Sequence, residues 1–252
     1  MAIPKGFRHK LYEMAGVLPD LGDCHGRLRL PRNDTEIYRS PSNGTLNYNL
    51  HFQGGILMDI LYSNKDFYII IKPVGMDSEH EVPAALDGEI FPIHRLDKNV
   101  GGVMVYARTK AAAAQLSRAV QEGTMVKEYV AMVHGTPPES GDWEDLLWKD
   151  SKKNKVFVVK RMRGGVKKAR LEFTRLSAGE TSLVHIRLHT GRSHQIRVQF
   201  SSRGFPLVGD HKYGSRDEAT APLLFSRRLT FPYHGKTMTF EALPDWAGLT
   251  SE

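Results

Sequence analysis

The residues best suited to chemistry lie in the stretch His-Arg-Leu-Asp-Lys at 94–98. A single carboxylate, Asp97, stands there among His94, Arg95 and Lys98, and two glycines follow before an apolar run. Cationic neighbours favour the ionised form of a carboxylate, so Asp97 suits a nucleophile or a charge stabiliser better than a proton donor. The glycines allow a tight loop that leads into a strand. A surface turn with a local salt bridge fits the same residues, and local chemistry leaves both interpretations open.

Other familiar arrangements of reactive residues are incomplete. His185, His189 and His194 have tempting spacing, but they span a strand, a turn and a helix start, and no acidic or cysteine partners accompany them. No glycine-rich phosphate loop precedes a helix, and Ser193 is not part of a Gly-x-Ser-x-Gly elbow. We therefore expect no metal site and no cofactor.

Two further features remain as candidates beside Asp97. Tyr129 lies in a predicted strand, and residues 190–197 read Thr-Gly-Arg-Ser-His-Gln-Ile-Arg, ending at Arg197. Taken alone, a strand tyrosine is more often a core residue, and a helix arginine more often a surface residue. Neither residue indicates a function by itself, so the question is whether both belong to one site with Asp97.

The composition is that of a globular chain with a surplus of positive charge. Its 252 residues hold 35 Lys or Arg and 28 Asp or Glu, a formal net charge of +7, which favours a polyanionic partner. The single cysteine, Cys24, excludes an internal disulfide. No apolar run approaches the ~20 residues of a membrane span, and the first residues lack the apolar core of a secretory signal. We therefore expect a cytoplasmic protein.

Much of the positive charge is concentrated in one segment. Between Ser151 and Arg175 lie ten Lys or Arg residues and one acid, Glu172. Apolar runs at 156–159 and 171–173 predict strands that flank the turn at Gly164 and Gly165. This pattern fits a charged surface that only contacts solvent, and it also fits a basic hairpin that contacts the phosphates of a nucleic acid.

The elements that position these residues are many short strands and two helices, which indicates an α+β protein. The clearest helix spans Thr109 to Glu122, with Thr109 as N-cap, a run of alanines, and Gly123 at its end. A second helix is predicted from His194 to about Ser201, capped by Ser193. Residues 137–145 are predicted to form a loop, and the predicted strands are 60–62, 67–71, 103–107, 127–135, 156–159, 171–173, 181–189, 223–225, 228–231 and 237–242.

Residues 1–57 differ from the rest of the chain because they show no sustained period of 2 or 3.6. The segment Asn-Leu-His-Phe-Gln-Gly at 49–54 is similar to an engineered protease-cleavage linker, and Met58 reads like a natural start. We expect 1–57 to be a poorly ordered N-terminal extension, either engineered or peripheral, and 58–252 to be the catalytic domain.

Five stretches taken together resemble the RluA-type pseudouridine synthases, and they occur in the order that this family shows. They are Lys72-Pro73-x-Gly75, His94-Arg95-Leu96-Asp97, Lys127-Glu128-Tyr129, the run from Leu188 to Arg197, and Gly204-x-Pro206-x-x-Gly209-Asp210-x-x-Tyr213-Gly214. The resemblance covers about three-quarters of the chain. It implies a mixed, mostly antiparallel central sheet with flanking helices.

The same resemblance implies the isomerisation of uridine to pseudouridine in structured RNA, either ribosomal or transfer RNA. The glycosidic bond to N1 breaks, the base rotates, and C5 joins the sugar. Asp97 matches the essential catalytic aspartate, and Tyr129 matches the tyrosine that stacks on the flipped uracil. Arg197 matches the basic residue that pairs with the aspartate, and Arg95 matches the residue that enters the space left by the flipped base.

RNA contacts are predicted at Lys127, Arg192, His194 and Gln195, and along the basic hairpin. We expect a monomer that requires RNA but no membrane, cofactor or obligatory protein partner. Three residues after the aspartate, the family usually has Thr-Ser-Gly, whereas this chain has Val100-Gly101-Gly102. An RNA-binding protein with weakened catalysis on the same scaffold is therefore the alternative hypothesis. An acid–base hydrolase is a third, but no motif supplies a second carboxylate.

Overall fold

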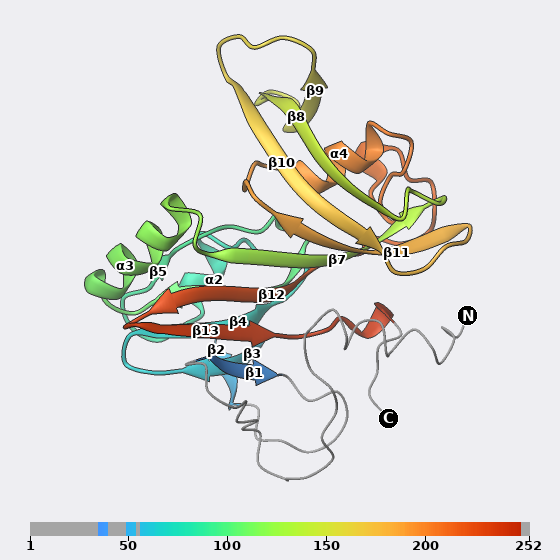
Figure 1. Cartoon of the computed structure of the whole chain (residues 1–252). Coiled ribbons are helices and arrows are strands. Elements are labelled where there is room, and N and C mark those ends of the chain that lie inside the picture. Colours follow the sequence, from blue (N-terminus) through green and yellow to red (C-terminus); the bar gives the residue numbers. More distant parts are fainter. Residues whose placement is uncertain (1–34, 40–48, 54–55, 248–252) are drawn as a thin grey trace. The chain divides into compact units, whose positions relative to one another are not determined.

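The computed structural model describes residues 35–39, 49–53 and 56–247 (Figure 1). They form two units, and the chain passes between them within β7 (Val126–His134) and within β12 (Leu224–Tyr233). The first, here called the α3 unit, contains the described residues up to 128 together with 225–244. The second, the α4 unit, contains 129–224 and 245–247. No helix in these ranges is long and apolar enough to cross a membrane.

The α3 unit is built on a mixed sheet. Its strands run in the order β2-β3-β4-β6-β12, with β13 beside β12, β1 beside β13, and β5 beside β6. Two of the described pairs, β6 with β12 and β1 with β13, are parallel, and the others are antiparallel. The bounds are β1 (Thr35–Arg39), β2 (Asn49–Gln53), β3 (Ile56–Ser63), β4 (Phe67–Lys72), β5 (Phe91–Pro92), β6 (Gly101–Ala107) and β13 (Lys236–Glu241).

The centre of this sheet is apolar on both faces, as central strands require. Every residue of β6 is buried, and β4 is buried at five of its six positions. Helix α3 (Lys110–Gln121) follows β6 directly, and its start confirms the predicted cap, because Thr109 Oγ1 accepts a hydrogen bond from the Ala112 amide at 3.1 Å. Its buried residues, Ala112, Leu116 and Ala119, confirm the predicted apolar face.

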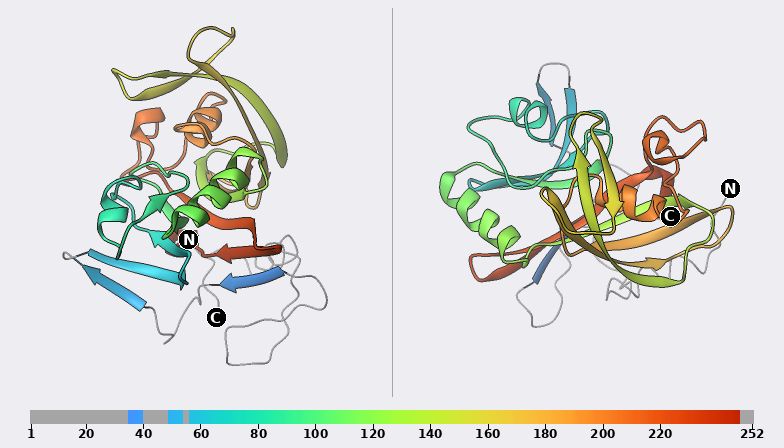
Figure 2. Two further views of the ribbon diagram at one scale, coloured as in Figure 1. Left: turned by 90° about the vertical axis from the view of Figure 1, so that its left-hand side faces the viewer. Right: turned by 90° about the horizontal axis from the view of Figure 1, so that it is seen from above.

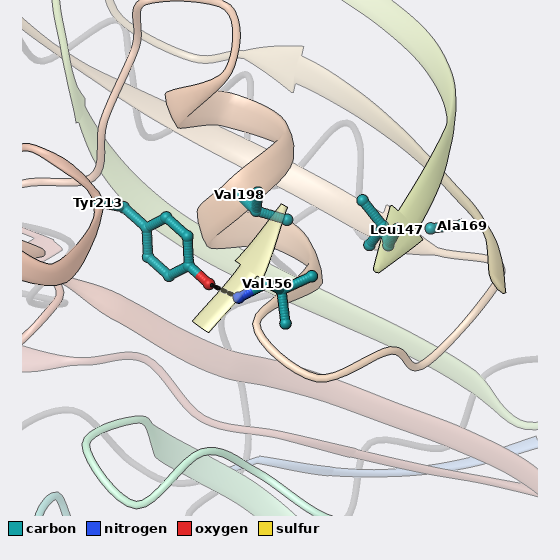
Figure 3. Packing of buried hydrophobic residues seen from close by; sticks show 5 residues of the cluster. All are labelled: Leu147, Val156, Ala169, Val198 and Tyr213. Carbon is teal, nitrogen blue, oxygen red and sulfur yellow. Dashed lines mark hydrogen bonds between the residues drawn. The ribbon is translucent and has the colours of Figure 1, made fainter. Parts of the chain in front are cut away.

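The α4 unit is a sheet in the order β7-β11-β10-β8-β9, accompanied by one α-helix, and the pairs β11 with β10, β10 with β8 and β8 with β9 are antiparallel. Its further elements are β8 (Ser140–Asp150), β9 (Lys155–Val159), β10 (Val166–Arg175), β11 (Thr181–Leu188), α4 (Gln195–Ser201), the 3-10 turn η1 (His211–Tyr213) and η2 (Asp245–Ala247). One face of β8, β9 and β10 packs on Val198 of α4 and on Tyr213, and Figure 3 shows the Tyr213 hydroxyl accepting the amide hydrogen of Val156 at 2.8 Å.

The predicted basic hairpin has a different pairing. Strands β9 and β10 do not pair with each other, because β8 lies between them and pairs with both. The sequence interpretation placed 137–145 in a loop and predicted no strand at 146–150, so it missed β8. The strand is held there by cross-strand partners: the carboxylate of Asp142 accepts two hydrogen bonds from Arg170 of β10, at 2.9 and 2.7 Å. Its acidic residues therefore face a basic neighbour strand.

Two other expectations about elements were wrong, and the segment before residue 58 contains two described strands. The cap of α4 is His194, in a left-handed conformation with φ 50°, and no side-chain capping bond is formed, so Ser193 does not serve as predicted. The two strands predicted at 223–225 and 228–231 are one strand, β12. Residues 35–39 and 49–53 form β1 and β2, so the segment before residue 58 contributes strands to the α3 unit, and the predicted boundary at Met58 falls within β3. Cys24 lies outside the described residues.

Candidate active site

Asp97 lies in the loop between β5 and β6 of the α3 unit and is partly exposed. The loop is closed by a hydrogen bond from the Val100 amide to the Asp97 carbonyl at 2.9 Å. Ser78 supports the residue before it, because its hydroxyl donates to the Leu96 carbonyl at 3.0 Å and accepts from the Leu96 amide. The backbone that carries the carboxylate is therefore fixed on both sides.

A buried lysine ties this loop to the end of β4. Lys72 is fully buried, and its ammonium donates to the carbonyls of Pro73 and Met76, both at 2.7 Å, and of Lys98 at 3.1 Å. Burial lowers the pKa of Lys72 to about 8, and the negative charges of Asp77 and Asp97 oppose that shift. The lysine thus supplies positive charge beneath the Asp97 loop as well as hydrogen bonds to its backbone.

The two exposed cations beside Asp97 have acidic partners in the segment that contains α2 (Glu81–Ala84). Arg95 Nη1 lies 2.8 Å from Glu79, and Lys98 Nζ lies 2.9 Å from Glu81. Both pairs are well exposed, so solvent screens them and each contributes little to stability. Within the α3 unit, the buried Lys72 therefore stabilises the Asp97 loop more than the exposed Arg95 and Lys98 do.

His94 is held as a neutral imidazole. Its Nε2 accepts the Val105 amide hydrogen at 3.4 Å, and its Nδ1 is buried with no hydrogen-bond partner among the described residues. Burial, followed by repulsion from the positive charge of Lys127, lowers the pKa of His94 to about 3. This histidine is consequently uncharged at neutral pH and does not add to the positive field around Asp97.

The glycines after the loop are required by close packing. Gly102 pairs with Ser226 of β12 at φ 123°, and a Cβ atom on it would lie 2.8 Å from the Ser226 Cα. A Cβ on Gly101 would meet the Lys72 carbonyl oxygen at 3.2 Å. Gly101 stands where the family usually has the serine of Thr-Ser-Gly. It is buried at the start of β6, so this difference from the family lies in a packed strand.

In the α4 unit the central feature is a buried ion pair. The Arg197 guanidinium binds Asp210 with two hydrogen bonds, Nε to Oδ2 at 2.7 Å and Nη2 to Oδ1 at 2.8 Å, and both side chains are buried. The guanidinium also lies 5.2 Å from the ring centre of Tyr213. The Tyr213 hydroxyl in turn bonds His194 Nδ1 at 2.9 Å. Arg197 is therefore held rigidly by residues on the η1 segment.

The turn before α4 is organised by Gln195. Its Oε1 accepts hydrogen bonds from the Thr190 hydroxyl at 2.8 Å and the Arg192 amide at 3.0 Å, and its Nε2 donates to the Arg170 carbonyl at 3.1 Å. Gln195 is only 3% exposed. Its amide group thus serves the turn, whereas Arg192 beside it is exposed, with its Nε bonded to the Lys168 carbonyl.

The predicted site residues divide between the two units. Arg95, Asp97 and Lys127 belong to the α3 unit, and Tyr129, Arg192, His194, Gln195 and Arg197 belong to the α4 unit. Tyr129 is a buried residue of β7, and His194 is partly exposed. Three residues with clear supporting contacts had been given no role from the sequence: Lys72, Asp210 and Tyr213. Each stands inside one of the five family stretches, which is the signal that could have identified them.

Comparison with known proteins decides the family. The model of the RNA pseudouridylate synthase family matches residues 66–202. This chain belongs to that family. As an RNA pseudouridine synthase it is an isomerase, and it forms pseudouridine in RNA. The RluA-type resemblance seen in the sequence is confirmed by relatives of that type.

One such relative of this pseudouridine synthase is the dual-specificity RNA pseudouridine synthase RluA of Escherichia coli strain K12. It is 34% identical over 210 residues, which cover 74% of this chain and 93% of that protein. The uncharacterized RNA pseudouridine synthase YlyB of Bacillus subtilis strain 168 is 31% identical over 215 residues, 75% of this chain and 70% of that one.

A solved structure shows the same fold. Human RNA Pseudouridylate Synthase Domain Containing 1 is similar with a TM-score of 0.66 and 23% sequence identity, over 75% of this chain and 83% of that chain. The described residues of this pseudouridine synthase contain no group of three or more His, Cys, Asp or Glu side chains that could hold a metal ion.

Proposed function

We propose that this pseudouridine synthase modifies a uridine in structured RNA, ribosomal or transfer RNA, and that Asp97 is its essential catalytic group. The observation that supports this most is the construction of the Asp97 loop. A partly exposed carboxylate is held by backbone bonds, and the buried ammonium of Lys72 is bonded to the carbonyl of the next residue. A surface turn with a local salt bridge does not need a buried lysine beneath it.

The reaction exchanges one bond to the sugar for another. The N1 bond to C1′ breaks, the C5 bond to C1′ forms, the C5 proton leaves, and N1 takes up a proton. The target base must leave the helix first, since its glycosidic bond is not reachable within the stack. In the proposal, Tyr129 stacks on the flipped uracil, Arg197 orients the aspartate, and Arg95 occupies the space that the base has left.

Asp210 and Tyr213 have a supporting role in this proposal. Their contacts fix the direction of Arg197, as second-layer groups do in a preorganised site. Lys127, Arg192 and His194 contact RNA phosphates, whereas Gln195, predicted from the sequence to contact RNA, maintains the turn that presents Arg192. In this proposal residues 58–252 supply the catalytic groups, β1 and β2 add strands to the sheet of the α3 unit, and the enzyme acts as a monomer.

Asp97→Asn tests the catalytic assignment. The substitution keeps the size of the side chain and removes its charge, so we expect RNA binding close to that of the unaltered protein and no pseudouridine formation. The measurement is release of tritium from RNA labelled at uridine C5, together with a binding titration on the same RNA. Retained tritium release by the variant would refute the role of Asp97.

The alternative, an RNA-binding protein with weakened catalysis, is motivated by Val100 and Gly101. Pseudouridine mapping of cellular RNA with and without the gene separates the two hypotheses and identifies the target. An enzyme leaves at least one site unmodified after deletion, and a pure binding protein leaves every site modified. A gene for Asp97→Asn, introduced into the deletion strain, should not restore pseudouridine at that site, whereas the unaltered gene should.

A further inference from the structure

The sheet β10-β8-β9 of the α4 unit has two faces of different character. Side chains alternate along a strand, so neighbours of the buried Leu147 and Val156 point the other way. On the inner face, Leu147, Val156 and Ala169 pack on α4 and Tyr213 (Figure 3). On the outer face, Trp148 stands opposite Phe157 of β9. Their ring centres lie 6.2 Å apart.

The outer face presents exposed apolar groups that folding does not use. Phe157 is 36% exposed, and Met162, in the connection from β9 to β10, is 55% exposed. Strands β8 and β9 and the connection to β10 are drawn in yellow-green to yellow in the two views of Figure 2. Phe157 lies beside Trp148, and adjacent apolar side chains at the surface, unlike single ones, are typical of a binding site.

Positive charge surrounds this aromatic surface. Lys155 Nζ lies 5.8 Å from the centre of the Phe157 ring, and the Arg163 guanidinium lies 5.1 Å from the centre of a Trp148 ring. Among the ten cations of residues 151–175, only Lys168 and Arg170 form ion pairs within the described residues. The others are Lys152, Lys153, Lys155, Lys160, Arg161, Arg163, Lys167 and Arg175. Aromatic rings among unneutralised cations are the chemical complement of a nucleotide, which has a flat apolar base and an anionic phosphate.

We propose that Phe157, with Trp148 beside it, is a stacking platform for an unpaired base of the RNA substrate. The inference rests on the proposed function. This base is not the target uridine, which in the proposal stacks on Tyr129 of β7. Strand β7 is four strand spacings from β9, which carries Phe157, in the sheet of this unit. At about 4.8 Å per spacing this is roughly 19 Å, more than one base can span. The enzyme therefore selects RNA with a second unpaired nucleotide, because a paired base has its faces covered by its neighbours.

The test uses a single-stranded RNA 12-mer of adenosine and cytidine, which contains no uridine and so cannot be modified. Its binding is measured by fluorescence anisotropy over a series of salt concentrations. Phe157→Leu keeps the side chain apolar and removes the ring. We expect affinity to fall by about 5- to 150-fold, the range for loss of one base–aromatic stack, with an unchanged slope of log affinity against log salt.

Two variants serve as matched controls. Phe157→Tyr keeps the ring and should bind like the unaltered protein. Lys160→Ala should weaken binding and also reduce the salt slope by about 0.7, since it removes one phosphate contact. Phe157 is exposed, so its variants should fold, and circular dichroism checks this. Binding by Phe157→Leu within twofold of the unaltered protein, or a salt slope reduced as in Lys160→Ala, would overturn the stacking platform. Failure of the unaltered protein to bind RNA at low salt would refute the proposed function itself.

Discussion

At the scale of single residues, the site is defined by buried charged and polar groups more than by the exposed cations that first draw attention. Arg95 and Lys98 pair with acids at the surface. The buried groups, Lys72 below the Asp97 loop and Asp210 beside Arg197, are the ones with fixed geometry. Fixed groups act on a reaction more strongly than mobile ones, because no reorganisation is needed when charge develops.

His94 predicts a dependence of stability on pH. Its pKa is about 3 in the folded protein and about 6.5 in an unfolded chain. Between these values the unfolded state binds one more proton, so the free energy of unfolding decreases as the pH falls from 6.5 towards 3, by about 1.4 kcal/mol per pH unit. In His94→Gln, the free energy of unfolding measured with urea should therefore fall less between pH 6 and pH 5 than it does in the unaltered protein.

The control is the same pair of proteins between pH 7.5 and pH 8.5, where both pKa values of His94 lie well below the pH and the two proteins should have the same pH dependence. Between pH 6 and pH 5, equal pH dependence in His94→Gln and the unaltered protein would show that His94 is not held neutral.

At the scale of elements, the Asp97 loop depends on how closely β6 approaches β12. The backbone of Gly102 lies against that of Ser226, and the Ser226 hydroxyl donates to the Val103 carbonyl at 3.0 Å. No side chain fits between the two strands at this point. The loop therefore leads into a strand whose position is set by backbone contact.

Gly102→Ala should destabilise the protein by about 3 kcal/mol, because the added methyl group overlaps the Ser226 backbone and the residue has φ 123°. Gly88→Ala is the matched control: Gly88 has φ 88°, but nothing lies within 4 Å of its Cβ position, so only the backbone penalty of about 1 kcal/mol applies. Denaturant unfolding measures both. If the two variants lose the same stability, the close approach of β6 and β12 has no energetic weight.

At the scale of the whole molecule, charge is unevenly distributed. The net charge is +7, yet the segment from Ser151 to Arg175 alone has ten basic residues and one acid. Salt screens a distant charge beyond about 8 Å at physiological ionic strength, so the location of a charge matters more for RNA binding than the total.

This distribution predicts that two double substitutions with the same effect on net charge will differ. Lys160→Glu with Lys167→Glu and Lys65→Glu with Lys110→Glu each lower the net charge by four, from +7 to +3. All four lysines are exposed. The first pair should weaken RNA binding and reduce its salt slope by about 1.4–1.8, and the second pair should change both far less. Equal effects in an anisotropy titration would contradict a localised RNA surface.

The sequence by itself determined several elements and the family. Helix α3 was predictable because Thr109 caps it and its apolar positions repeat at 3.6, and both signals depend only on neighbours in the chain. The family assignment was predictable because its five stretches survive as contiguous residues. The roles assigned to Asp97, Tyr129 and Arg197 follow from that resemblance and remain proposals.

The tertiary structure decided what depends on partners distant in the chain. Strand β8 was missed because two prolines precede it and its first residues, Ser140, Gly141 and Asp142, have the composition of a turn. Its extended conformation depends on β10, which pairs with it and supplies Arg170 to Asp142. The partner of Arg197 is 13 residues away, and the lysine that holds the Asp97 loop is 26 residues from the carbonyl it binds. No local period encodes such pairs, because burial and ion pairing are set by packing between elements. For this pseudouridine synthase, the sequence determined the family and so proposed the reacting groups, and only the fold shows which groups contact them.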